Sequence, residues 1–291
     1  MLSELVNGVT AVSTGLAGDM AGVVGGLRGD DPDDWDPEYI ARTLPLLKNT
    51  FGSYFRGEVR GMENIPTGGP SLLVGNHSGG TMIADTFVFA YCFYERFGPY
   101  RRFHQLAHDV AARSPALGIL RRYGVLAASH ENARKAFQRR APVLVYPGGD
   151  YETFRPSWHS DRIEFGGRKG FIRLALEEDV PIVPVVAIGG QETALFVTRG
   201  QRVARALGVD RLTRIKVMPI QIGPPFGVTL LDLPLRVPLP AKITVQVLPP
   251  VDVRERFGKD PEPDEVYEGL TDHMQDALSE LADERTLPLV G

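Results

Sequence analysis

The sequence predicts an α/β fold with a largely parallel mixed sheet flanked by helices. Two features carry this prediction. Between about residues 72 and 188, short apolar stretches of strand length alternate with helical patterns, an order typical of parallel strands covered by helices. One of these stretches, Ile182–Ile188, is apolar at every position, as expected of a strand that is buried on both faces. A chain of 291 residues is long enough for one large domain or two small ones.

The N-terminal region predicts a helical arm over residues 1–54. Apolar side chains recur near a helical period in residues 1–28, and six glycines interrupt them. Each glycine weakens a helix by up to about 1 kcal/mol, so we expect a loosely held helix there, docked on the body of the protein or on lipid. The acidic stretch Asp30–Asp34, with Pro32 inside it, predicts a turn or short linker. A helix over Pro37–Tyr54 follows.

Residues 55–291 form the predicted α/β domain. Its first elements are expected to be a strand at Leu72–Gly75, a helix at Asp85–Phe97, a broken helix at Ala107–Tyr123, a helix at Asn132–Arg140, a strand at Val143–Tyr146, a helix at Phe171–Glu178 and the strand at Ile182–Ile188. Further on, Ile243, Val245 and Val247 alternate with polar residues, which predicts a strand with one wet face. Asp264–Arg285 carries apolar residues at helical spacing and acids in its first turn, which predicts an amphipathic helix packed on the body.

Composition narrows the class of protein. Hydrophobic residues make up 43% and charged residues 23% of the chain, as in an ordinary globular protein. The net charge of −4 and the pI near 5.9 argue against nucleic acid as a partner. The single cysteine, Cys92, excludes an internal disulfide framework and predicts a reducing, cytoplasmic compartment. We find no signal-peptide pattern before Arg28 and no run of the roughly 18–20 apolar residues that cross a bilayer, so we expect a protein that lies on a membrane at most.

Charge is unevenly distributed along the chain. Residues 95–140, the cationic segment, hold ten Lys or Arg against three acids. Two interpretations stay open. These cations form solvated helix faces, or together they bind phosphate groups or lipid head groups.

The first candidate for chemistry is His77, with Asp85 as its partner. His77 follows the predicted strand at Leu72–Gly75 and stands in a glycine-rich loop, the position where α/β sheets place reactive groups. Histidine transfers protons near neutral pH, and a carboxylate fixes its tautomer. Eight residues of continuous helix would separate the two by about 12 Å, so the pair requires the chain to fold back, and Gly79-Gly80 supplies the backbone freedom. The alternative for Asp85 is a helix N-cap.

Two further segments are candidates for ligand binding. After the strand at Val143–Tyr146, Gly148 and Gly149 open a loop whose amides are able to face a ligand oxygen; the alternative is a plain Pro-Gly turn. Arg168 and Lys169 precede a predicted helix start, where cations oppose the helix dipole. A bound phosphate would resolve that conflict, and so would solvent exposure.

Several familiar motifs are absent from the sequence. It contains no Gly-x-Ser-x-Gly, which argues against a nucleophile-elbow hydrolase, and neither a phosphate-loop lysine motif nor a dinucleotide glycine fingerprint. His104 and His108 have the spacing of metal ligands on one helix face, but no third ligand is evident. We therefore expect no metal.

Four blocks of the sequence together resemble the glycerolipid acyltransferase family, typified by lysophosphatidic acid acyltransferase. In the family's order they are Asn76-His77 through Asp85, Leu120–Ser129, Tyr146-Pro147-Gly148-Gly149 and Val180–Val185. The resemblance runs from about Phe55 to Pro250. Two departures stand out. Seven residues separate His77 from Asp85 where the family has four, and Gly148 replaces the glutamate that the family associates with a glycerol-phosphate acceptor. With Gly148 at this position, the sequence is closer to the branch of the family that resembles neutral-lipid acyltransferases.

The resemblance implies transfer of a fatty acyl group from an acyl thioester to a hydroxyl of a glycerolipid or lysophospholipid. His77 would be the general base and Asp85 its partner, the Gly148 and Gly149 amides would steady the oxyanion, and Arg168 and Lys169 would hold phosphates of the donor. The donor, acyl-CoA or acyl carrier protein, is a co-substrate, and no cofactor is implied. We expect a peripheral protein on the inner face of the cell membrane. Two alternatives stay open: a catalytically inactive lipid-binding protein of the same fold, and a thioesterase-like hydrolase.

Overall fold

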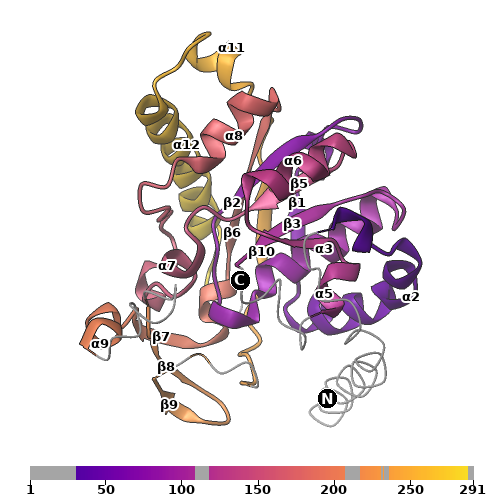
Figure 1. The fold of residues 1–291 in the computed structure, drawn as a ribbon. Coiled ribbons are helices and arrows are strands. Elements are labelled where there is room, and N and C mark those ends of the chain that lie inside the picture. The colour runs from indigo at the N-terminus through magenta and orange to yellow at the C-terminus, as the bar shows by residue number, and fades with distance from the viewer. Residues whose placement is uncertain (1–30, 109–117, 207–216, 231, 233–235, 288–291) are drawn as a thin grey trace.

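A mixed sheet with helices on both faces forms the body of the protein. The computed structural model describes residues 31–108, 118–206, 217–230, 232 and 236–287 (Figure 1). In these residues the main sheet has the strand order β1-β10-β6-β2-β5-β3-β4. Its strands are β1 Glu58–Arg60, β2 Ser71–Gly75, β3 His104–Ala107, β4 Val125–Ala127, β5 Pro142–Val145, β6 Ile182–Ile188 and β10 Thr244–Val247. Strands β6, β2, β5, β3 and β4 pair in parallel, and β10 runs antiparallel to β6. The predicted largely parallel mixed sheet flanked by helices is confirmed.

Helices cover the two faces of this sheet. The α-helices in the described part of the chain are α2 Pro37–Leu47, α3 Ala84–Phe97, α5 Ile119–Arg122, α6 His130–Gln138, α7 Gly149–Thr153, α8 Gly170–Glu178, α9 Gln201–Ala206, α11 Val253–Phe257 and α12 Pro263–Asp283. Alternation along β2 divides the core: Leu72 and Val74 pack with α6, α8 and α12, whereas Leu73 packs with α2 and α3. The predicted C-terminal amphipathic helix is confirmed, with Val266, Leu270 and Leu278 buried along one stripe of α12.

A second, smaller sheet follows β6. It consists of β7 Leu195–Thr198, β8 Ile220–Gly223 and β9 Gly227–Thr229, all antiparallel. Figure 1 shows it with α9 at the lower end of the molecule, away from α8, α11 and α12. The sequence patterns did not predict this sheet, because its strands are short and its apolar residues do not alternate regularly with polar ones.

The N-terminal arm is only partly described. Residues 1–30, with the predicted loose helix, lie outside the described residues. The described part packs on the body: Ile40 of α2 is fully buried against the core beside α3. The acidic stretch is a docked turn, since Asp33 pairs with Arg102 and Arg139, and these guanidinium groups hold the pKa of its carboxyl well below the usual range. The predicted helix over Pro37–Tyr54 is α-helical to Leu47 and continues as a π-helical turn, Lys48–Gly52.

Two predicted elements were wrong in part. The broken helix expected at Ala107–Tyr123 begins wrongly, because Ala107 ends strand β3; residues 109–117 lie outside the described residues, and Ile119–Arg122 is helical as expected, as the short helix α5. The wet face expected around Ile243–Val247 is largely covered, because Thr244 is buried and Gln246 is half-buried. Among the described residues, no helix has both the length and the apolar character that a bilayer crossing requires.

Candidate active site

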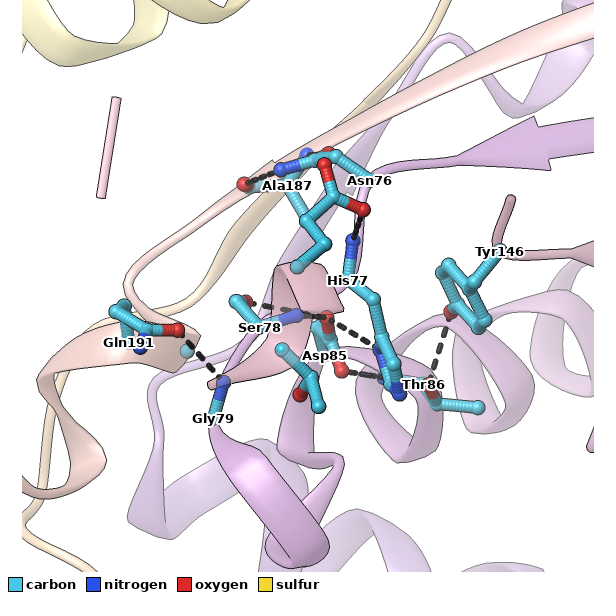
Figure 2. A network of polar contacts seen from close by, with 12 residues as sticks. Asn76, His77, Ser78, Gly79, Asp85, Thr86, Tyr146, Ala187 and Gln191 are labelled. Carbon is cyan, nitrogen blue, oxygen red and sulfur yellow. Dashed lines mark hydrogen bonds and ion pairs between the residues drawn. The ribbon is translucent and has the colours of Figure 1, made fainter. Parts of the chain in front are cut away.

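His77 stands at the carboxyl end of β2, on a loop fixed by its neighbour Asn76. The Asn76 side chain is buried and pairs with the backbone of Ala187 in β6: its amide donates to the Ala187 carbonyl at 2.9 Å, and its oxygen accepts the Ala187 amide at 2.7 Å (Figure 2). This pair extends the β2–β6 contact by one residue, so the chain turns out of the sheet at His77. The predicted placement of His77 on a loop directly after a strand is confirmed.

The chain then folds back between His77 and Asp85. Gly79 and Gly80 have φ of 89° and 64°, and Ile83 has φ of 39°, so a tight turn over Gly80–Met82 precedes α3. A Cβ on Gly80 would lie 2.1 Å from Asp232 Oδ2, so glycine is required there for space as well as for backbone angle. The fold-back brings Asp85 Oδ2 to 3.5 Å from His77 Nδ1 (Figure 2).

Asp85 is a buried carboxylate with fixed orientation. Its side chain is 1% exposed, and Oδ2 accepts hydrogen bonds from the Ser78 amide at 3.0 Å and the Ser78 hydroxyl at 3.1 Å. Oδ1 accepts from the amide of Thr86 at 2.7 Å. Asp85 therefore lies inside the first turn of α3 and is not the N-cap, which is Ile83. A carboxylate beside Nδ1 favours the tautomer with the proton on that nitrogen, which leaves Nε2 as the proton acceptor.

The imidazole of His77 is held from its face as well. It stacks on the Tyr146 ring with centroids 4.2 Å apart and planes at 16°. The Tyr146 hydroxyl accepts a hydrogen bond from Thr86 Oγ1 at 2.9 Å, so the loop after β5 supports the loop after β2 (Figure 2). The His77 side chain stays 13% exposed, as a group that must reach a substrate requires.

A buried Glu152 and a buried Arg155 hold the backbone of His77 from both sides. Glu152 Oε2 accepts the His77 amide at 2.9 Å, and Arg155 Nη1 donates to the His77 carbonyl at 2.6 Å. Glu152 Oε1 also accepts the amide of Glu164 at 2.9 Å. Burial raises the pKa of Glu152 to about 7, while the Arg155 guanidinium and the His77 amide act in the opposite direction. The sequence analysis missed both residues; a Glu and an Arg three apart, directly after a strand-ending Pro-Gly-Gly, were the available signal.

A second buried ion pair holds the fold-back turn. Arg236 Nε donates to Asp232 Oδ1 at 2.7 Å, and the two side chains are 1% and 0% exposed. Asp232 Oδ2 accepts from the amide and the hydroxyl of Thr81, and Arg236 Nη2 donates to the Gly79 carbonyl at 2.7 Å. We call this pair the Asp232–Arg236 clamp. Its two charges stand within an otherwise apolar stretch of the sequence, which is a signal for a buried pair that the sequence analysis did not use.

Gly148 and Gly149 lie where β5 leads into α7, beside this centre. A Cβ on Gly148 would lie 2.4 Å from the Glu152 side chain, so the small residue lets Glu152 reach the His77 amide. The Gly149 amide donates to the Tyr146 carbonyl at 3.1 Å, as in a tight turn. The role of these amides at an oxyanion stays a prediction.

Arg168 and Lys169 lie directly before α8 and contact protein groups. Arg168 Nη1 donates to the carbonyls of Pro147 and Gly148 at 2.9 and 2.6 Å, and Nη2 pairs with Asp150 at 3.2 Å. Lys169 pairs with Asp264 of α12. Arg168 thus braces the Gly148 loop, and the proposed phosphate contacts of both residues stay a prediction.

Most described members of the cationic segment have protein partners. They pair as follows: Arg101 with the Pro66 carbonyl, Arg102 and Arg139 with Asp33, Arg122 with Asp36, Arg134 with Glu178, and Lys135 with Glu131. These pairs favour the first interpretation, solvated helix faces, over the binding of phosphate groups or lipid head groups.

His104 lies on strand β3, so the helix face that would have carried it with His108 is not formed. The His104 ring is fully buried with Nδ1 3.0 Å from the Gly124 carbonyl, and burial lowers its pKa to about 4. Among the described residues there is no group of three or more His, Cys, Asp or Glu side chains suited to a metal ion.

Comparison with known proteins finds a family that part of the chain resembles. Residues 56–188 match the model of the Acyltransferase family, and this range contains His77, Asp85 and Glu152. The crystal structure of a 1-acyl-sn-glycerophosphate (LPA) acyltransferase, PlsC, from Thermotoga maritima has the same fold, with a TM-score of 0.53, 16% identity, and coverage of 86% of this chain and 83% of that one.

The chain is also similar in sequence to other proteins. An uncharacterized protein of Mycobacterium tuberculosis is 28% identical over 279 residues, covering 93% of this chain and 75% of the relative. A human protein named DGAT1/2-independent enzyme synthesizing storage lipids is 29% identical over 184 residues, covering 62% of this chain and 51% of its own length. The chain is thus similar to the Acyltransferase family over residues 56–188 and to PlsC in its fold.

Proposed function

We propose that the protein transfers a fatty acyl group from an acyl thioester to the hydroxyl of a glycerolipid or lysophospholipid. The observation that carries this proposal is the approach of His77 Nδ1 to the buried Asp85 carboxylate at 3.5 Å, across a chain fold-back. The wider spacing in the sequence is thereby compensated by one tight turn. A lipid-binding protein without turnover would have no need of this pair.

The proposed mechanism is direct transfer. His77 Nε2 takes the proton of the acceptor hydroxyl as the oxygen attacks the thioester carbonyl. The tetrahedral intermediate collapses with cleavage of the C–S bond, and the imidazolium returns the proton to the leaving thiolate. Asp85 orients the ring and stabilises the imidazolium. Amides near Gly148 and Gly149 would steady the oxyanion.

We infer that the donor is acyl-CoA or an acyl carrier protein, bound through phosphate contacts of Arg168 and Lys169. Both would exchange a carboxylate partner, Asp150 or Asp264, for phosphate oxygens. We favour a neutral-lipid acceptor over a glycerol phosphate, because Gly148 stands where the family's glutamate is expected and a relative is named for storage-lipid synthesis. The protein would act peripherally at the inner face of the cell membrane.

The test supplies purified protein with labelled acyl-CoA or acyl carrier protein and a panel of acceptors: monoacylglycerol, diacylglycerol and lysophosphatidic acid. We expect acyl transfer by the wild type and a loss of about 10²–10⁴-fold in His77→Ala. Equal transfer by the two proteins would refute the proposal. Release of free fatty acid at the same rate with and without acceptor would identify a hydrolase, and binding of lipid with no thioester consumption would identify a binding protein.

A further inference from the structure

The small sheet presents an exposed apolar face. Of the ten large apolar side chains that the described residues expose, six lie on β7–β9 and the chain flanking them. They form what we call the hairpin surface: Leu195 at 45%, Ile222 at 40%, Phe226 at 47%, Val228 at 68%, Leu230 at 52% and Val237 at 44% exposed. Apolar groups gathered in this way mark a surface that another apolar body covers.

Strand register puts three of these side chains, Leu195, Ile222 and Val228, on one face. Leu195 is opposite Ile222, and Ile222 is opposite Val228, and directly opposed residues project to the same side. The other face points inward, since Phe196 and Gln221, also opposite each other, are 0% and 2% exposed. An antiparallel sheet normally turns polar residues to water. This sheet has an apolar outer face as well as a buried inner one.

The charged residues near this apolar face indicate which kind of partner it binds. Leu195–Ala206 and Val217–Leu230 contain three arginines and no Asp or Glu. Two of them, Arg202 and Arg205 of α9, are exposed. Trp158, 60% exposed, adjoins the sheet, because its neighbour Ser157 accepts the Phe196 amide at 2.9 Å. Apolar side chains bordered by arginine and tryptophan match the hydrocarbon, phosphate and interfacial layers of an anionic bilayer.

We propose that the hairpin surface, flanked by Arg202, Arg205 and Trp158, docks the protein on an anionic lipid bilayer. The Asp232–Arg236 clamp joins the chain that follows β9 to the Gly79–Thr81 turn. The docked face is therefore connected by one buried ion pair to the loop that carries His77. This last step depends on the proposed function: a lipid acceptor that leaves the bilayer at this face would lie next to His77, the proposed general base.

Vesicle binding by the full chain tests the proposal. Wild-type protein is compared with Val228→Asp/Leu230→Asp by co-sedimentation with vesicles of phosphatidylcholine alone and of phosphatidylcholine mixed with phosphatidylglycerol. We expect the double variant to bind mixed vesicles at least about tenfold more weakly, because two apolar side chains no longer enter the bilayer. Arg202→Gln/Arg205→Gln is expected to weaken binding to mixed vesicles roughly fivefold per charge and to leave pure phosphatidylcholine binding unchanged.

The matched control is Leu287→Asp, which changes a side chain of 57% exposure outside the hairpin surface and is expected to bind as the wild type does. Val228→Ser/Leu230→Ser repeats the test without new charges. The proposal is overturned if both double variants at Val228 and Leu230 bind vesicles as strongly as the wild type does. Residues 1–28 or another surface would then carry the attachment. An unchanged vesicle affinity accompanied by a shift in oligomeric state on gel filtration would also overturn the proposal, and would identify a second copy as the occupant.

Turnover separates this inference from the proposed function. If both hold, Val228→Asp/Leu230→Asp keeps its activity toward a short-chain, water-soluble acceptor and loses activity toward the same head group in vesicles. Docking without any transfer by the wild type would refute the proposed function alone. Transfer from vesicles that the hairpin variants leave unchanged would refute the docking surface alone.

Discussion

Removal of the Asp232 carboxylate tests how the catalytic loop is held. In Asp232→Ala, the guanidinium of Arg236, 1% exposed in the wild type, loses its ion-pair partner, and the Thr81 amide and hydroxyl lose their acceptor. Breaking a buried pair by removing one charge costs about 3–5 kcal/mol, because the remaining charge is left uncompensated. Arg236 keeps its hydrogen bonds to the carbonyls of Thr193 and Gly79, so we expect the lower part of that range.

A loss of about 3 kcal/mol corresponds to a fall in Tm of roughly 6–12 °C for a chain of this size. Urea unfolding monitored by circular dichroism measures the free energy, and initial rates of acyl transfer report the loop. We expect kcat to fall more than KM changes, because the turn positions His77 without contacting the donor.

The double variant Asp232→Leu/Arg236→Met provides the control for the clamp. Removing both charges leaves no buried unpaired ion, so the double variant should unfold at a higher urea concentration than Asp232→Ala. The reasoning is refuted if Asp232→Ala costs less than about 1 kcal/mol, or if the destabilisation of the double variant equals the sum for the single variants Asp232→Leu and Arg236→Met.

Three further predictions concern the same region. Asp85→Asn should lower kcat about 10²-fold or more with little change in KM, since the amide does not stabilise the imidazolium; rates measured across pH check it, and an unchanged kcat contradicts the assigned role. Gly80→Ala, at φ of 64° and facing Asp232, should lower both stability and activity, whereas Gly68→Ala, with open space around it, should change neither in melting and rate assays. The pKa of His104 is lowered from 6.5 to about 4 by burial, so its contribution to stability is complete above about pH 6.5 and is lost as pH falls through 4. His104→Gln should therefore flatten the decline of the unfolding free energy between pH 7 and 4 by about 3 kcal/mol. An identical decline in the two proteins would show that His104 titrates normally.

Sequence patterns predicted the central part of the fold and missed its edges. Strands β2, β5 and β6 are fully or largely buried, so their sequences are apolar at nearly every position and distinctive. Strands β1 and β4 have three residues each, too few for a period to be evident, and β3, with four residues, was not predicted apart from Ala107, which was assigned to a helix. Short strands of this kind are specified by their partners in the sheet.

The site was predictable where it is local in sequence. His77, Asp85 and the glycines between them lie within nine residues, and the need for a fold-back followed from helix geometry. The contacts of Glu152 and Asp232 with this loop span 75 and 151 residues, and no local pattern carries such information. Arg168 was predicted to bind phosphate from its place before a helix, and its closest partners in the structure are the carbonyls of the Pro147–Gly148 turn.

The topology explains why the side chains of the candidate site gather at this point. Strands β5, β2 and β6 are adjacent and parallel, so the loops after them meet at one edge of the sheet. The loop after β2 brings His77 and the loop after β5 brings Tyr146. The loop after β6 brings Gln191, whose Oε1 accepts the Gly79 amide at 3.2 Å.

The small sheet is inserted between β6 and β10 and returns through the Asp232–Arg236 clamp to the Gly79–Thr81 turn. The His77 loop is consequently fixed on one side by Glu152 and Arg155, and on the other by a chain that carries the hairpin surface. If the hairpin surface docks on lipid as proposed, a displacement of β7–β9 is transmitted to the Gly79–Thr81 turn through the Asp232–Arg236 clamp, whose side chains are buried and paired. Mutations of the clamp should then lower transfer from vesicles more than transfer to a soluble acceptor. Equal losses in the two assays would show that the clamp holds the His77 loop without coupling it to docking.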